Sequence, residues 1–279
     1  LCGCSNGCVG FVIFVFLLPV SNIQSQNLYD LEHTKKFADY LFTSGQYNLA
    51  AEEYERVVFL NPTNESAKLR LIRAYKRNGD IDKGIDRMLA LHNNKASQLS
   101  VPFSMEFVQM NLRLRNYPAI TNLLENNTML PDRFKTNTKL SMHLLGAEWD
   151  KARDLSAEKP SEINGKLFGI VEESMALKYK KPWLGTSLSV ILPGSGKVYA
   201  GRWKDGIISF IFIAGSAWQA YRGFDKFGTG SAYGWIFGGV SFGFYTGNIF
   251  GSWKAVKQYN TGLDVQLQHK AAHIIYSDH

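Results

Sequence analysis

Apolar residues are unevenly distributed along this chain of 279 residues. They gather in residues 9–20 and again in residues 183–251, and the long stretch between these blocks is rich in charge. Within that stretch, apolar positions recur at the spacing of amphipathic helices rather than in strict alternation. The pattern predicts an all-α protein with a helical region before residue 180 and a strongly apolar helical module after it.

The region from residue 31 to 160 contains an internal repeat with a period near 34 residues. Its clearest unit runs from Gly45 to Pro62, and a second unit follows in register. Aromatic or aliphatic residues stand at the expected inter-helix turns, positions 47, 81, 117 and 149, with spacings of 34, 36 and 32. The first two units are distinct and the last two are more divergent. These units resemble tetratricopeptide repeats.

The resemblance gives packing roles to particular residues. Gly45 closes a turn, Tyr47 packs over it, Ala50 permits a close helix crossing and Pro62 ends the second helix. The full set of predicted repeat-packing residues is Gly45, Tyr47, Ala50, Tyr54, Pro62, Tyr75 and Gly79. Such helix pairs stack into a solenoid with a concave groove that binds peptides or helices. The alternative is an array that only spaces or packs against its own anchor. We assign residues 26–160 to the solenoid and residues 161–181 to a capping and linker helix.

Residues 182–260 are predicted to form a membrane module. Residues 183–192 are apolar but too short to cross a bilayer, so we expect an interfacial or re-entrant helix there. Residues 206–221 and 231–253 are predicted as a transmembrane helical hairpin, with tyrosine and tryptophan near its ends. Counting the short helix as a third span is the alternative topology.

Glycine marks two features of this module. The first is a turn motif with the residues Pro193, Gly194, Gly196, Tyr199, Gly201 and Gly206, interpreted as a tight turn with close packing rather than as a ligand site. Its Gly-Ser-Gly-Lys lacks the flanking residues of a phosphate-binding loop, so we reject nucleotide binding. The second is a seam of glycines at four-residue steps: Gly239, Gly243, Gly247 and Gly251. We expect this seam to pack on Ala214 and Ala217 of the hairpin, or else to form a homodimer.

The turn motif, together with Gly247-Asn248, Gly251 and Tyr259-Asn260, is similar to a C-terminal membrane domain of exported Bacteroidetes-type proteins. That domain is itself similar to the two-transmembrane-helix domain family. The resemblance covers about residues 180–260 and departs at Lys197, where glutamine is expected. It implies an architecture and no established activity.

The N-terminus has the pattern of an exported protein. Residues 9–20 form an apolar run of 12 residues, which suits a signal-peptide core, and cleavage is predicted after Ser25. An uncleaved anchor or a lipoprotein are the alternatives. All three cysteines precede residue 9, so the mature chain would have none. We therefore expect a bacterial inner-membrane protein with a periplasmic N-terminal domain.

Charge and candidate chemistry narrow the function further. The net charge is +7, and lysine and arginine flank the apolar segments, where they would meet lipid headgroups. No basic stripe interleaved with aromatics indicates nucleic-acid binding. His269 and His273 are four residues apart without a third ligand, and residues 261–279 are interpreted as a solvated tail. We expect no catalytic cluster, metal or cofactor.

These observations predict a non-enzymatic, membrane-anchored adaptor or scaffold. Its periplasmic repeat solenoid would bind a protein partner of the cell envelope, in an assembly or secretion complex, while the hairpin contacts the lipid bilayer. The alternative is a membrane component for lipid handling, or a channel or transporter subunit, in which the glycine-rich hairpin is the functional part.

Overall fold

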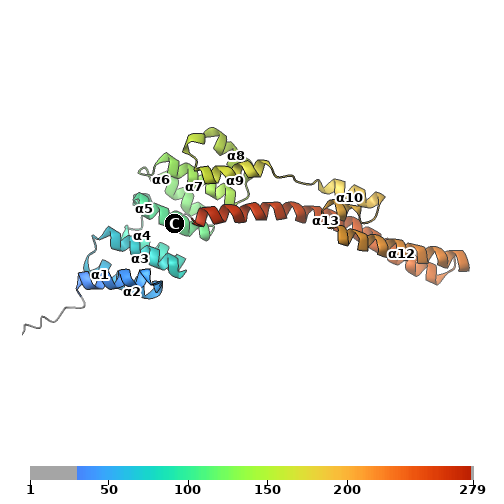
Figure 1. Cartoon of the computed structure of the whole chain (residues 1–279), viewed down its shortest axis with the longest axis horizontal. Helices are drawn as coiled ribbons and strands as arrows, with labels where there is room; N and C mark the ends of the chain where they lie inside the picture. Colours follow the sequence, from blue (N-terminus) through green and yellow to red (C-terminus); the bar gives the residue numbers. More distant parts are fainter. Residues whose placement is uncertain (1–29, 278–279) are drawn as a thin grey trace, which may run out of the picture. The chain divides into compact units, whose positions relative to one another are not determined.

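The computed structural model describes residues 30–277, and this range is all-helical, as predicted (Figure 1). The predicted signal peptide at residues 1–25, with Cys2, Cys4 and Cys8, lies outside the described residues. The chain forms two compact units, which divide after Gly84. Unit 1 covers residues 1–84 and unit 2 covers residues 85–279, and each is described by itself.

Unit 1 contains α1 (Leu31–Thr43), α2 (Tyr47–Leu60), α3 (Glu65–Asn78) and the start of α4 (Ile81–Leu91). Polar caps fix where α1 and α3 begin, because side-chain oxygens satisfy backbone N–H groups that lack a partner in the first turn. Asp30 accepts from the amide of His33 at 2.8 Å, and Asn64 accepts from the amide of Ala67 at 3.0 Å. Helix α2 lies between α1 and α3 and contributes the fully buried Tyr54 to the core.

Unit 2 begins with the rest of α4 and continues with five further α-helices. They are α5 (Val101–Arg113), α6 (Tyr117–Asn126), α7 (Asp132–Leu145), α8 (Trp149–Glu158) and α9 (Gly165–Met175), with short 3₁₀ turns at Ala96–Gln98 and Pro160–Glu162. The four predicted turn positions coincide with helix starts, since residues 47, 81, 117 and 149 are the first residues of α2, α4, α6 and α8. Helix α9 lies where the capping helix was predicted. The tetratricopeptide assignment itself stays a prediction.

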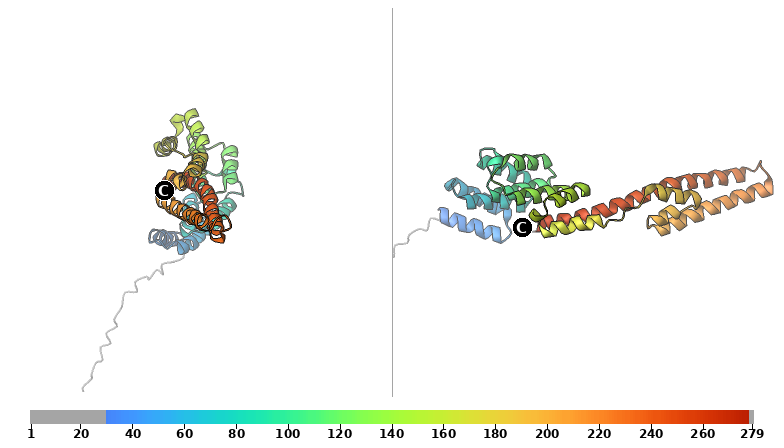
Figure 2. Two further views of the ribbon diagram at one scale, coloured as in Figure 1. Left: turned by 90° about the vertical axis from the view of Figure 1, so that its right-hand side faces the viewer. Right: turned by 90° about the horizontal axis from the view of Figure 1, so that it is seen from above.

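The C-terminal part of unit 2 contains α10 (Pro182–Ile191), α11 (Ser195–Tyr199), α12 (Trp203–Phe227) and α13 (Ala232–Ser277). Helix α12 and the first half of α13 run side by side as a hairpin, and α10 and α11 pack at its base (Figure 2). Helix α13 is continuous over 46 residues. The boundary that we predicted at residue 260 is therefore not a helix end.

Among the helices of residues 30–277, none combines the length and the apolar character needed to cross a membrane. The prediction that residues 206–221 and 231–253 are transmembrane spans was therefore wrong. Both segments are helical, but neither lies in a helix that meets this requirement. The apolar run of α12 from Ile207 to Tyr221 extends over only about 22 Å at 1.5 Å per residue. In α13, repeated glycines dilute the apolar side chains.

The end of α13 is part of the core of unit 2, so the predicted solvated tail was wrong. Leu267 and Ala271 are buried against α7, α8 and α9. The buried cluster that they join contains Leu140, Leu144, Trp149, Ala152, Ile163, Leu167, Ile170 and Val171. The C-terminal segment thus completes a core that α7–α9 alone would leave open to water.

Candidate functional site

The predicted repeat-packing residues of unit 1 lie at its turns and helix interfaces. They are Gly45, Tyr47, Ala50, Tyr54, Pro62, Tyr75 and Gly79. Gly45 and Gly79 have φ of +79° and +90°, which favours glycine. The Tyr54 hydroxyl donates to Asp39 Oδ1 at 2.5 Å, and burial followed by this hydrogen bond raises the pKa of Tyr54. Of this set, Ala50 and Tyr54 are buried in the core of unit 1, whereas Gly45, Pro62 and Gly79 lie in exposed turns.

In unit 2, the odd-numbered helices α5, α7 and α9 share one face, and a cavity of about 510 Å³ lies along it. Its apolar lining includes Met105, Val108 and Leu112 of α5, Phe134 of α7 and Ile275 of α13. Amide and hydroxyl groups of α7 stand among these side chains. Apolar walls with scattered hydrogen-bonding groups are typical of a surface that receives an amphipathic helix or peptide.

The C-terminal part of α13 occupies the neighbouring part of this face, along α7 and α9. Besides Leu267 and Ala271, polar contacts fix its register. Gln268 Nε2 donates to the carbonyl oxygen of Leu145 at 3.1 Å, and Lys270 forms an ion pair with Glu173. The chain therefore buries an apolar stripe of its own C-terminal helix against α7 and α9.

An acidic residue of α13 connects three segments at the edge of this contact. Asp264 Oδ1 accepts from Trp149 Nε1 at 2.8 Å and also from the hydroxyl of Tyr179, which precedes α10. Burial, and then the hydrogen bond to Asp264, raise the pKa of Tyr179 to about 12. At neutral pH the phenol is therefore protonated and can donate to the carboxylate.

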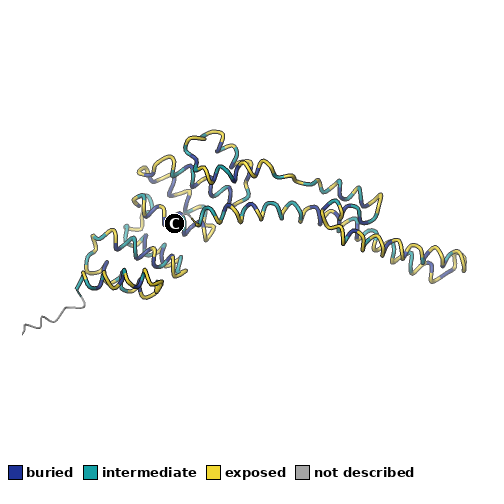
Figure 3. Tube along the Cα trace, viewed as in Figure 1, coloured by how far each residue is buried: buried dark blue, intermediate teal, exposed yellow. Residues whose placement is uncertain are grey.

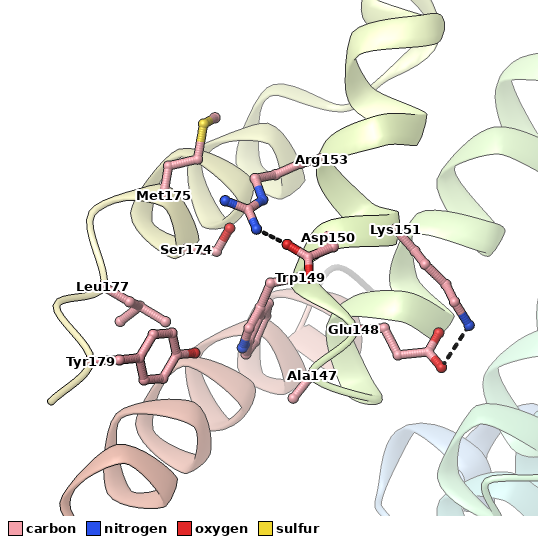
Figure 4. A pocket seen from close by; sticks show the side chains of 10 residues that line it. All are labelled: Ala147, Glu148, Trp149, Asp150, Lys151, Arg153, Ser174, Met175, Leu177 and Tyr179. Carbon is pink, nitrogen blue, oxygen red and sulfur yellow. Dashed lines mark hydrogen bonds and ion pairs between the residues drawn. The ribbon is translucent and has the colours of Figure 1, made fainter. Parts of the chain in front are cut away.

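Trp149 and Tyr179 lie on one side of a cavity of about 560 Å³, with Leu177 next to Tyr179 (Figure 4). On the other side, Arg153 is paired with Asp150, and Lys151 is paired with Glu148 at 3.0 Å. The charges at its rim therefore neutralise each other.

The segment between α9 and α10 is fastened to α13 by Lys180 and Asn260. The Lys180 amide donates to Asn260 Oδ1 at 2.9 Å, and Asn260 Nδ2 donates back to the Lys180 carbonyl at 2.8 Å. The Lys180 ammonium lies 3.9 Å from the ring centroid of Tyr259 and donates to the Tyr199 carbonyl at 2.8 Å. Tyr199, Tyr259 and Asn260, which carried the sequence resemblance, thus meet at one point.

The predicted turn residues lie on or beside α11, in the order Pro193, Gly194, Gly196, Tyr199, Gly201 and Gly206. Three of them allow backbones to touch. A Cβ on Gly196 would lie 1.9 Å from the carbonyl oxygen of Gly185, and one on Gly194 would lie 2.1 Å from that of Gly206. Gly194 also has φ of +90°. The structure agrees with the interpretation of a tight, closely packed turn.

A buried chain of hydroxyl groups reinforces this packing, and the sequence analysis did not identify it. Ser252 Oγ donates its one proton to the Asn248 carbonyl at 2.8 Å. In the hydrogen bond of 2.6 Å between Ser189 and Ser252, Ser189 is therefore the donor. Ser189 Oγ in turn accepts from the Gly196 amide at 3.0 Å. The chain joins α10, α11 and α13 without leaving either hydroxyl unpaired.

The predicted use of the glycine seam within the hairpin was wrong. A Cβ on Gly239, Gly243 or Gly247 would have no neighbour within 4 Å, and both Ala214 and Ala217 are exposed. Gly251 alone of the seam meets another segment, the Lys197 side chain. The hairpin instead crosses closely through other small residues: Ser216, Ala220, Gly223 and Gly234. The face of α12 that turns inward contains Ile213, and it does not include the predicted contact residues Ala214 and Ala217.

Large apolar side chains cover the outside of the hairpin, whose ribbon is largely exposed (Figure 3). The exposed set is Ile207, Ile208, Phe210, Ile211, Phe212, Trp218, Tyr221, Phe227, Tyr233, Trp235, Ile236, Val240, Phe242, Phe244, Phe250 and Trp253. Many large apolar side chains exposed on one module are typical of an interaction surface. At the base, the Lys257 ammonium lies 3.8 Å from the Trp253 ring centroid, which places a cation beside the apolar band.

No protein-family model matches the chain, and no curated protein or solved structure matches it either. The two sequence resemblances therefore stay predictions that depend on the residues described above.

Among residues 30–277, no group of three His, Cys, Asp and Glu side chains is arranged to hold a metal ion. His269 and His273 lie on α13. The sequence analysis missed the docking of this helix, although its signal was present. Leu263, Leu267 and Ala271 recur at four-residue steps and continue an apolar stripe past residue 260.

Proposed function

We propose that the chain is a non-enzymatic adaptor anchored at a lipid bilayer by the α12–α13 hairpin, with a helical array that binds a protein partner of the bacterial envelope. The array would lie on the periplasmic side of the inner membrane. The observation that carries the proposal is α13 itself. One unbroken helix contributes exposed apolar side chains to the hairpin and buried ones to the array.

The outer surface of the hairpin supports the proposal that the hairpin contacts lipid. Aliphatic and aromatic side chains form a band on α12 and α13, and tryptophan and tyrosine stand toward its limits, as they do at bilayer interfaces. Lys204 and Lys257 lie against the rings of Trp203 and Trp253, so their ammonium groups are placed for headgroups beside that band. The hairpin would enter the bilayer partly, without any one helix crossing it.

The shared face of α5, α7 and α9 supports the proposal that the chain binds a protein partner. Its part along α7 and α9 holds the apolar stripe of α13, which indicates the kind of segment that fits there. Met105 and Phe134 line the open cavity beside that stripe. The proposed partner segment is therefore an amphipathic helix that lies next to the end of α13.

Flotation of the full chain with phospholipid vesicles tests the anchor. We expect the chain to float with vesicles and the double variant Ile211→Glu, Phe242→Glu to remain unbound, because both side chains are exposed on the hairpin. Phe59→Glu is the matched control, since Phe59 is 83% exposed but lies on α2. Equal flotation of both variants would contradict the lipid contact.

Photo-crosslinking in native membranes tests the partner surface. A crosslinker at Met105 should give a discrete product, and one at the exposed Glu125 of α6 should not. Phe134→Glu should abolish the Met105 product while circular dichroism remains unchanged. The same product from both positions, or its persistence in the Phe134 variant, would reject this surface as the partner site.

A further inference from the structure

A third cavity lies at the surface of the hairpin module, between α11, α12 and α13, with a volume of about 360 Å³. Its walls are mostly apolar: Ile208, Phe212 and Ile213 from α12 and Phe244 from α13. Three polar side chains also line it, namely Lys197, Ser209 and Asn248, one from each helix. An apolar cavity with a few convergent polar groups is typical of a site for a small amphiphilic ligand.

Lys197 brings a positive charge to this cavity. Its ammonium group donates to Ser209 Oγ at 2.7 Å, and the Ser209 hydroxyl donates a hydrogen bond to the backbone carbonyl of Asp205 at 2.8 Å. Within the described part of the chain, Lys197 has no carboxylate partner, because the side chain of Asp205 is paired with Arg202 at 2.7 Å. An ammonium group has three protons, so two remain for a ligand.

The second observation that indicates a ligand is the side chain of Asn248. Its residue is only 3% exposed, yet neither Nδ2 nor Oδ1 has a hydrogen-bond partner in the protein. Leaving a buried amide without partners is costly, and a buried group of this kind requires an explanation. Asn248 lines the same cavity as Lys197, and an amide N–H group can donate to an oxyanion.

We propose that this cavity binds the anionic head of an acyl lipid, with one oxyanion between Lys197 and Asn248 and the acyl chain along Phe212 and Phe244. The oxyanion would neutralise the lysine and accept a hydrogen bond from Asn248 Nδ2, and the apolar walls would cover the first part of the chain. The exposed surface beside the cavity belongs to the proposed bilayer contact, so this inference rests on that part of the proposed function for the source of its ligand.

Native mass spectrometry of the full chain in detergent tests the site with three probes: phosphatidylglycerol, phosphatidylcholine of the same acyl chains, and inorganic phosphate. We expect phosphatidylglycerol to be retained in preference to the other two. Lys197→Gln should weaken that binding by about ten-fold, the effect of losing one charge-assisted hydrogen bond, and Lys197→Arg should weaken it less. Lys254→Gln, which removes the same charge from the exposed face of α13, should change nothing.

Asn248→Leu separates a binding role from a structural one. The substitution removes two unpartnered buried atoms while keeping the volume similar, so the melting temperature without lipid should stay level or rise. The preference for phosphatidylglycerol should nevertheless fall. A fall in both would show that Asn248 only supports the fold and would overturn its assignment as a ligand group.

Two further outcomes would overturn the proposal. Inorganic phosphate that binds as well as phosphatidylglycerol would exclude an acyl lipid, and equal binding of the two lipids would exclude a charged head. Vesicle flotation distinguishes these failures from that of the proposed function. If the chain floats with phosphatidylcholine vesicles but shows no preference for the anionic lipid, only the cavity assignment fails.

Discussion

The indole Nε1 of Trp149 donates a hydrogen bond of 2.8 Å to Oδ1 of Asp264, although the two residues are 115 positions apart. This contact joins the start of α8 to α13, next to the buried cluster that holds Leu267 and Ala271. Tyr179 donates to the same carboxylate oxygen. Because α13 also forms half of the hairpin, this point connects the proposed anchor to the proposed binding array.

Asp264→Ala should lower the free energy of unfolding of unit 2 by about 1–3 kcal/mol, because it leaves the largely buried Trp149 N–H without a partner. Denaturant titration measures this loss, and hydrogen exchange should show faster opening of residues 262–277. Asp154→Ala is the control, since Asp154 is exposed on α8. In a double-mutant cycle, Trp149→Phe should cost little once Asp264 is absent. Additive losses would contradict a direct coupling.

Deprotonation of Tyr179 should lower the free energy of unfolding in strongly alkaline solution. Its pKa is raised to about 12 by burial and by the hydrogen bond to Asp264, whereas in the unfolded chain a tyrosine has a pKa of about 10. The unfolded state therefore loses this proton at a lower pH than the folded state. The stabilisation that Tyr179 contributes is fully present below about pH 10 and is lost as pH rises toward 12. Tyr179→Phe should remove that part of the slope. The check is tyrosinate absorbance, in which the variant should lack one late-titrating phenol.

The inter-helix turns predicted at residues 47, 81, 117 and 149 lie where helices begin, because local signals determine where a helix starts. Tyr47 and Ile81 each follow a glycine by two residues, Trp149 follows one by three, and all three begin a helix, as Tyr117 does. The close turn around α11 was predicted for a similar reason, since closely spaced glycines indicate backbone contact whatever their partner is.

Contacts between distant segments were not predictable in this way. The periodic seam from Gly239 to Gly247 suggested an interface, but which face of α13 turns inward depends on its crossing with α12, which Gly223 and Gly234 determine. The docking of Leu267 was missed because its partners on α7 and α9 precede it by about a hundred residues. Helical spacing identifies an apolar stripe without naming the surface that it covers.

The exposed seam gives a test of the predicted homodimer. Gly239→Ala and Gly243→Ala should each stabilise the monomer by about 0.5–1 kcal/mol, because a methyl group there meets nothing within 4 Å and alanine favours the helix. If the seam packs against a second copy, the same methyl groups would push the helices apart and weaken association. Sedimentation in detergent at several concentrations measures this. Unchanged association with increased stability would reject the seam as a dimer interface.

The turn at α11 should respond to alanine according to what the added methyl group meets. In Gly196→Ala the Cβ would lie 1.9 Å from the Gly185 carbonyl oxygen, and backbone must move, so we expect a loss of about 3 kcal/mol or more. In Gly185→Ala the nearest atom is a Val256 methyl group at 2.6 Å, which can rotate, so the loss should be smaller.

Gly215→Ala is the control, because Gly215 lies on α12 with open space around it and the substitution should stabilise the helix by up to about 1 kcal/mol. Chemical denaturation followed by tryptophan fluorescence gives all three values. The expected order of stability is Gly215→Ala above the parent chain, then Gly185→Ala, then Gly196→Ala. A Gly196 variant as stable as the parent would show that α10 and α11 do not touch as closely as the turn requires, and that the glycine motif has another purpose.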